Sequence, residues 1–115
     1  MNIEQIREYA LSFNESEEDC PFGPTVVVFK VGGKIFMLLP LDTDDLRFNV
    51  KCDPELAVTQ RQEFPDHILP GFHMNKKHWN TIIADGHLSD TQLKQFITDS
   101  YHLVKPKKKL KSKEK

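Results

Sequence analysis

The spacing of hydrophobic residues changes along this chain, and each spacing predicts a different kind of element. Over residues 3–13 the apolar positions are Ile3, Ile6, Ala10 and Phe13. Steps of three or four residues are typical of one face of a helix, and Asn2 suits the N-cap position. We therefore predict an amphipathic helix over residues 3–13.

The next apolar runs have the composition of strands. Residues 25–31 and 34–41 are rich in β-branched and aliphatic residues, and Gly32-Gly33 separates them. Two such runs around a Gly-Gly pair predict a β-hairpin. Residues 15–19, ahead of the hairpin, are mostly acidic and predict a loop.

Residues 46–52 alternate strictly between apolar and polar side chains, which predicts a strand with one buried and one solvated face. The apolar set is Leu46, Phe48, Val50 and Cys52, and the polar set is Arg47, Asn49 and Lys51. The polar set would form a basic strip on the outer face of a sheet.

The second half predicts a helix over 54–64, short strands over 67–71 and 79–84, and a final helix. Asp53-Pro54 pairs an N-cap residue with a proline at the first helical position, and Ser89-x-x-Gln92 is a capping box. The final helix would pack through Leu93, Phe96, Ile97, Tyr101 and Val104. Trp79, at the start of its strand, is interpreted as a core anchor.

The predicted order is α-β-β-β-α-(β)-β-α. Consecutive strands with short links favour an α+β fold: an antiparallel β-sheet packed by helices on one face. A chain of 115 residues forms one domain, here residues 1–104. Residues 105–115 are a Lys-rich tail that we expect to be disordered.

Charge is distributed unevenly between the two parts of the chain. Residues 1–66 hold 13 acidic and 6 basic residues, a net charge of −7, whereas residues 67–115 hold 4 and 10, a net charge of +6. No apolar run reaches the length of a membrane span, and no secretory signal is visible. We therefore expect a cytoplasmic monomer that does not bind membranes. Cys20 and Cys52 are interpreted as buried thiols, and a disulfide between them would require the fold to bring them together.

No segment matches a nucleophile elbow, a phosphate-binding glycine loop or a closely paired set of zinc ligands. His73-x4-His78 lacks a neighbouring Cys or an intervening carboxylate, and a polar loop explains it better. We expect no enzyme activity, no cofactor and no metal site.

The basic second part and the basic strip instead favour nucleic-acid binding, with DNA as the expected partner. The candidate contact residues are Arg47, Lys51, His73, Asn75, Lys76, Lys77 and His78. A structural reading of the 70–79 segment stays open, in which His73 and Asn75 satisfy buried backbone groups. An alternative function is a protein- or metal-binding module that uses Glu4, Glu8 and the acidic residues 15–19.

Several short motifs occur in a fixed order along nearly the whole chain. They are Lys34-Ile35-Phe36, Val50-Lys51-x-x-Pro54-Glu55-Leu56, Pro70-Gly71, His73-x-Asn75-Lys76-x-His78-Trp79-x-Thr81, Asp85-Gly86 and Asp99-Ser100-Tyr101. This set resembles the MmcQ/YjbR family, also called DUF419. The resemblance implies a CyaY-like fold, a bacterial cytoplasmic protein of unknown biochemical role, and the "double wing" DNA-binding motif proposed for that family.

Overall fold

The computed structural model describes residues 1–71 and 74–106, and this part of the chain forms three helices and one six-stranded sheet. The helices are α1 (Ile3–Leu11), α2 (Pro54–Glu63) and α3 (Asp90–Val104). The strands are β1 (Glu17–Asp19), β2 (Val26–Val31), β3 (Lys34–Pro40), β4 (Arg47–Lys51), β5 (Ile68–Pro70) and β6 (Trp79–Ile83). All neighbouring strands are antiparallel, in the order β1-β2-β3-β4-β6-β5.

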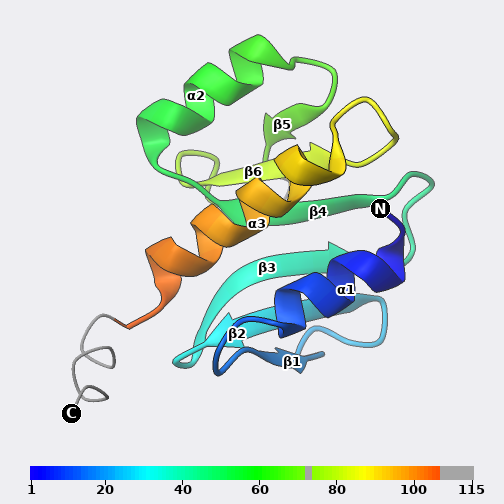
Figure 1. Ribbon diagram of the computed structural model, residues 1–115, viewed down its shortest axis with the longest axis vertical. Coiled ribbons are helices and arrows are strands. Elements are labelled where there is room, and N and C mark those ends of the chain that lie inside the picture. Colours follow the sequence, from blue (N-terminus) through cyan, green and yellow to red (C-terminus); the bar gives the residue numbers. More distant parts are fainter. Residues whose placement is uncertain (72–73, 107–115) are drawn as a thin grey trace.

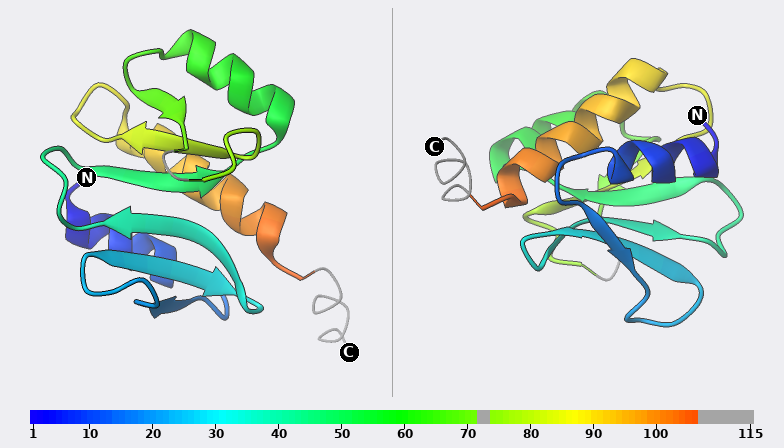
Figure 2. Two further views of the ribbon diagram at one scale, coloured as in Figure 1. Left: turned by 180° about the vertical axis from the view of Figure 1, so that it is seen from behind. Right: turned by 60° about the horizontal axis from the view of Figure 1, so that its bottom comes forward.

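The molecule has two layers, with the three helices on one face of the sheet (Figure 1). Seen from behind, the strands lie in front and α3 runs behind them (Figure 2, left). We call this second side the open face. The predicted α+β class, with an antiparallel sheet and helices on one face, is confirmed.

The ends of the helices follow from short polar signals in the sequence. Asn2 with Gln5, and Ser89 with Gln92, form capping boxes at the starts of α1 and α3. The carboxylate of Asp53 accepts from two backbone N–H groups at the start of α2. Each of these side chains satisfies backbone donors that have no partner inside the helix.

The hairpin of β2 and β3 turns at Gly32 and Gly33, whose φ angles are +60° and +81°. Two consecutive left-handed residues match the two-residue turn that suits twisted strands, and glycine adopts this conformation without steric cost. A Cβ on Gly32 would also come within 2.5 Å of the side chain of Pro106. Lys105 and Pro106 therefore belong to the packed domain, and the rest of the predicted tail, 107–115, lies outside the described residues.

The core lies between the helices and the covered face of the sheet. Phe36 is fully buried and packs edge-on against Phe13 and Tyr101, whose rings stack on each other with centroids 4.4 Å apart. The predicted stripe on α3 is confirmed at Leu93, Ile97, Tyr101 and Val104, which are buried, and Phe96 is partly buried. These contacts fix α1 and α3 on the sheet.

The acidic loop predicted over 15–19 is partly wrong, because Glu17–Asp19 forms β1 at the edge of the sheet. All three side chains are exposed, so no hydrophobic alternation could reveal the strand. Glu18 accepts two hydrogen bonds from Arg7, and Asp19 pairs with Lys30 at 3.3 Å. A short, charged edge strand discourages pairing with another sheet edge.

The two cysteines differ in their surroundings. Cys52 is buried as predicted, but Cys20 is exposed, because it precedes a loop around Pro21 that leaves its thiol at the surface. Both are free thiols. Among the described residues, no helix has both the length and the apolar composition needed to cross a lipid bilayer.

Candidate binding site on the open face

The open face carries a continuous row of small and medium-sized side chains across five strands. Residues paired directly in register point to the same side of a sheet. The pairs Val28–Leu38, Leu38–Asn49, Asn49–Thr81 and Thr81–Leu69 define this row. Its middle is polar, since the hydroxyl of Thr81 donates to the side-chain oxygen of Asn49.

A hollow of about 520 Å³ lies over this row. Its lining residues are Phe22, Val26, Leu38, Pro40, Asp42, Thr43, Arg47, Asn49, Met74 and Thr81. An apolar lining with a few convergent polar groups is the usual composition of a ligand site, and the volume lies in the usual range. The open face therefore offers a concave binding surface.

The predicted solvated strip on β4 is only partly solvated. Asn49 is 8% exposed, because it lies on the floor of the hollow beside Leu38 and Thr81. Arg47 and Lys51 are half-buried on the same face. The alternation predicted the correct side of the sheet for all three residues. It did not predict that neighbouring residues would bury Asn49.

The charge of Arg47 is already partly compensated. Its Nε and Nη2 atoms donate to the two carboxylate oxygens of Asp45 at 2.6 and 2.8 Å, which is a bidentate pair. The hydrogen bond from Arg47, opposed by desolvation and supported by its charge, lowers the pKa of Asp45. Any anion that reaches Arg47 must compete with this carboxylate.

Trp79 is not the core anchor that its position suggested. It is paired in register with Lys51 on the open face, is only half-buried and lies outside the core cluster. Its neighbour Asn80 points to the covered side and is fully buried. Asn80 donates to the carbonyl of Ala57 and the side chain of Gln60, and accepts from Arg61 at 2.7 Å. The anchoring of this strand to α2 is therefore polar.

The segment that follows β5 is shaped largely by its own backbone. The N–H of Gly71 donates to the carbonyl of Trp79 at 2.9 Å, and a Cβ on Gly71 would lie 2.7 Å from that of Trp79. The Asn75 side chain accepts from the N–H of Lys77, and its carbonyl accepts from His78 and Trp79. Asn75 thus builds the turn, but the N–H that its side chain satisfies, that of Lys77, is exposed and not buried.

The lysines of this segment are not directed to the hollow. The Nζ atom of Lys76 lies 3.3 Å from the carbonyl of Gly71, to which it donates. Lys77 lines a separate depression beside α2, together with Pro54, Glu55, Val58 and Arg61. The residue of this segment that does line the hollow is Met74, and His73 lies outside the described residues.

The predicted contact residues that the structure describes therefore lie in more than one place. Arg47 and Lys51 share the open face, whereas Lys77 belongs to the side of α2. Sequence reasoning missed Met74, Thr81 and the 64% exposed Phe22. Only Phe22 gave a signal in advance, since an aromatic residue between Pro21 and a Gly-Pro pair has little regular structure to bury it.

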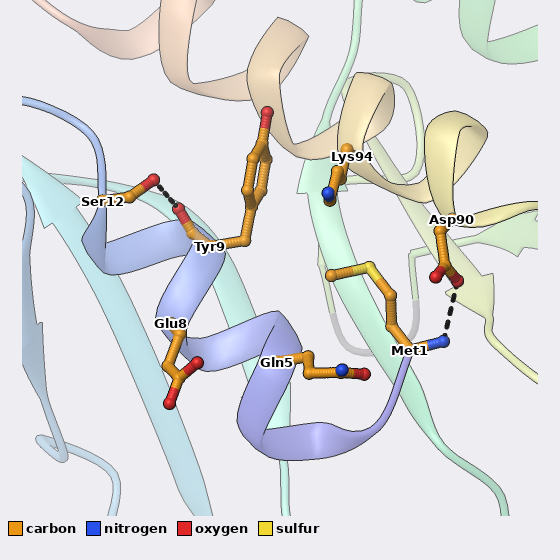
Figure 3. Close-up of a pocket in the computed structure, with 7 residues that line it drawn as sticks. All are labelled: Met1, Gln5, Glu8, Tyr9, Ser12, Asp90 and Lys94. Atoms are coloured by element: carbon orange, nitrogen blue, oxygen red, sulfur yellow. Dashed lines mark hydrogen bonds and ion pairs between the residues drawn. The ribbon is translucent and has the colours of Figure 1, made fainter.

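The acidic residues of the alternative hypothesis are dispersed. Glu8 lines a depression between α1 and α3, but Figure 3 shows its carboxylate pointing away from Asp90. Asp90 instead pairs with the amino group of Met1 at 2.8 Å, and Lys94 lies in the same depression. Across residues 1–71 and 74–106, Glu4, Glu8 and residues 15–19 form no group of three that could hold a metal ion.

Comparisons with known proteins give a consistent result. The model of the YjbR family matches residues 11–103. The uncharacterised protein YbdF of Escherichia coli O157:H7 is 41% identical over 105 residues, which cover 88% of this chain and 82% of YbdF. The uncharacterised protein YjbR of Escherichia coli K12 is 29% identical over 101 residues, which cover 88% and 85%.

Solved structures agree. A crystal structure of the Deinococcus radiodurans protein DR2400, with the family domain DUF419, superposes with a TM-score of 0.84 at 35% identity, and covers 89% of this chain and 77% of that one. A Pseudomonas syringae protein superposes with a TM-score of 0.76 at 27% identity, and covers 91% and 100%.

Proposed function

We propose a function from the premise that this chain belongs to the YjbR family, whose relatives named above are uncharacterised, so the proposal rests on the chain's own geometry. The chain acts as a non-catalytic protein that binds unpaired nucleic acid across the open face of its sheet. The hollow over β3, β4 and β6 is the observation that supports this function best.

The composition of the hollow favours an unpaired base over a duplex. A duplex presents its phosphates and hides the faces of its bases, so it is bound mainly by free cationic side chains. Among the described residues that line the hollow, the one basic residue is Arg47, which is already paired with Asp45, and Asp42 adds a negative charge. An unpaired base offers an apolar face and a polar edge, and both match this hollow.

Each part of the hollow has a role in this proposal. Leu38 and the flexible side chain of Met74 pack against the face of a base. Asn49 and Thr81 lie on the floor, where an amide and a hydroxyl can contact a base edge. Lys51, next to Trp79 on the same face, is placed to contact a phosphate.

Fluorescence anisotropy with a labelled single-stranded oligonucleotide and its duplex form, each at two salt concentrations, tests this proposal. We expect the single strand to bind more tightly. One phosphate contact, from Lys51, predicts a salt slope of about −0.7, since single strands give about −0.7 per contact. Non-specific binding has dissociation constants of up to about 0.1 mM. The proposal is overturned if no single strand binds at a protein concentration of about 0.1 mM, or if the duplex binds more tightly.

Two charge reversals separate the open face from the 74–79 segment. Lys51→Glu changes the open face and should weaken binding of the single strand. Lys77→Glu makes the same change of charge beside α2 and is the matched control, with unchanged affinity expected. Equal losses in the two variants would mean that binding follows net charge and not the hollow.

A further inference from the structure

His67, Asp85 and His87 come together at one end of the β5–β6 pair, although His67 lies 18 residues before Asp85 and 20 residues before His87. His67 immediately precedes β5, and its carbonyl accepts from the N–H of Ile83 at 2.8 Å. Asp85 and His87 lie on the connection between β6 and α3, drawn in yellow in Figure 1. The antiparallel pairing of the two strands therefore places His67 beside this connection.

The carboxylate of Asp85 lies between the two imidazoles. Its Oδ2 atom is 3.1 Å from Nε2 of His67, and its Oδ1 atom is 3.2 Å from Nδ1 of His87. The ring centroids of the two histidines are 4.4 Å apart. One ligand atom from each residue can be chosen so that all three lie within 4.8 Å of one another.

These separations suit a metal ion. Bonds of about 2.0–2.2 Å from imidazole nitrogen and carboxylate oxygen put neighbouring ligand atoms about 3.3 Å apart in a tetrahedral site. Each histidine nitrogen already has this spacing from one of the two Asp85 oxygens. A single ion that takes one atom from each residue would draw together atoms that now lie within 4.8 Å of one another. The ion would replace the hydrogens that now lie between these atoms.

The charge at this corner also favours a cation. The backbone N–H of His87 also donates to the Asp85 carboxylate, at 3.2 Å, and this bond helps to hold the carboxylate between the two rings. Asp45 also lies close enough for the two carboxylates to interact, but Arg47 already compensates its charge, so Asp85 is the uncompensated carboxylate of this group. The side chain of His67 is 17% exposed and that of His87 is 73% exposed, so the group opens to solvent on one side.

We propose that His67, Asp85 and His87 bind a divalent transition-metal ion such as Zn²⁺ or Co²⁺. A set of two imidazoles and one carboxylate suits such ions. Mg²⁺ and Ca²⁺ fit it less well, because they prefer oxygen ligands. Three protein ligands leave a coordination position for water or another ligand. The competing explanation is that the three side chains only hydrogen-bond the connection to β5.

Titration of the purified, metal-free protein with Co²⁺, followed by its visible absorption, tests this proposal, with Zn²⁺ as a competitor. We expect one bound Co²⁺ ion per chain and its displacement by Zn²⁺. The visible absorption band should be that of a Co²⁺ ion with a low coordination number. His87→Ala removes a highly exposed ligand without disturbing the core and should weaken binding at least tenfold. Asp85→Asn should have a similar effect.

His102→Ala is the matched control, since His102 is an exposed histidine on α3, away from this group. It should bind Co²⁺ as the unmodified protein does. The proposal is overturned if the unmodified protein binds no Co²⁺ at millimolar concentration, or if His87→Ala and His102→Ala bind it equally well. Zn²⁺-dependent shifts of the ring nitrogens of His67 and His87 by nuclear magnetic resonance give a readout that a purely structural role would not produce.

Discussion

The hydroxyl of Ser100, on α3, donates a hydrogen bond of 2.6 Å to the backbone carbonyl of Phe36, on β3. The same oxygen accepts from the N–H of Lys51, on β4, at 2.8 Å. Phe36 is the extra residue of a bulge, since Ile35 pairs with Lys30 and Met37 with Phe29. A buried side chain thus bridges β3 and β4 just beyond the Met37–Val50 pair, at the residue that bulges out of the pairing between β2 and β3.

Removal of this hydroxyl should be costly. Ser100→Ala leaves a buried carbonyl and a partly buried N–H without this partner, so we expect the free energy of unfolding to fall by about 1–3 kcal/mol. Urea denaturation measures it. Thr91→Ala removes an exposed hydroxyl from the same helix and should stay within about 0.5 kcal/mol of the unmodified protein. Equal effects would show that the bridge does not contribute.

Asn80 should hold α2 on the sheet, and Trp79 should not. The buried residue of α2 is Ala57, so this helix has little apolar contact with the sheet. It is held mainly by the hydrogen bonds that the Asn80 side chain donates to Ala57 and Gln60. Asn80→Ala is expected to cost about 2 kcal/mol and to speed amide exchange in α2 more than in α3. Trp79→Leu changes the opposite face and should leave exchange in α2 unchanged. Loss of protection in both variants would contradict this division.

The two thiols should differ in reactivity. Burial, followed by the charges of Asp53 and Asp99, raises the pKa of Cys52 to about 11. At pH 8 only about one thiolate in a thousand would then be present at Cys52. Ellman's reagent should modify one thiol quickly, and Cys20→Ser should abolish this phase until denaturant is added. Two fast thiols in the folded protein would contradict the burial of Cys52.

The pair of Asp45 and Arg47 should depend on pH in a defined direction. The pKa of Asp45 is lowered in the folded protein, so the pair stabilises the fold above the ordinary pKa near 3.8, and this contribution is lost as pH falls through the lowered value. Because the pair is partly exposed, we expect it to contribute less than about 1 kcal/mol to the free energy of unfolding. The difference in unfolding free energy between the protein and Asp45→Asn should be constant from pH 8 to 5 and should shrink as the pH falls below the ordinary pKa of aspartate.

The same substitution probes the open face. Asp45→Asn frees Arg47 from its carboxylate partner, so affinity for a single-stranded oligonucleotide should rise and its salt slope should steepen. Anisotropy titrations at pH 7 measure both quantities. An affinity that is unchanged or lower would mean that Arg47 does not contact the phosphates.

Local patterns predicted much of the fold because the relevant forces act over a few residues. The capping residues Asn2, Asp53 and Ser89, and the Gly32-Gly33 turn, each satisfy a backbone requirement inside their own segment. β1 escaped prediction because its stability comes from pairing with β2 and not from its own charged side chains. Trp79 was assigned to the wrong environment because size alone does not tell which side of a strand it occupies.

By itself, the sequence determined the α+β class, the helix ends, the hairpin and the membership of Arg47 and Lys51 in one face. Tertiary structure alone decided which of the chemically capable residues meet. Antiparallel pairing of β5 with β6 brings His67 to Asp85 and His87, and the register of β3, β4 and β6 forms the hollow around Asn49. The physical reason is that hydrogen-bond register between strands places residues far apart in the chain within a few ångströms, and no spacing along the sequence records that register.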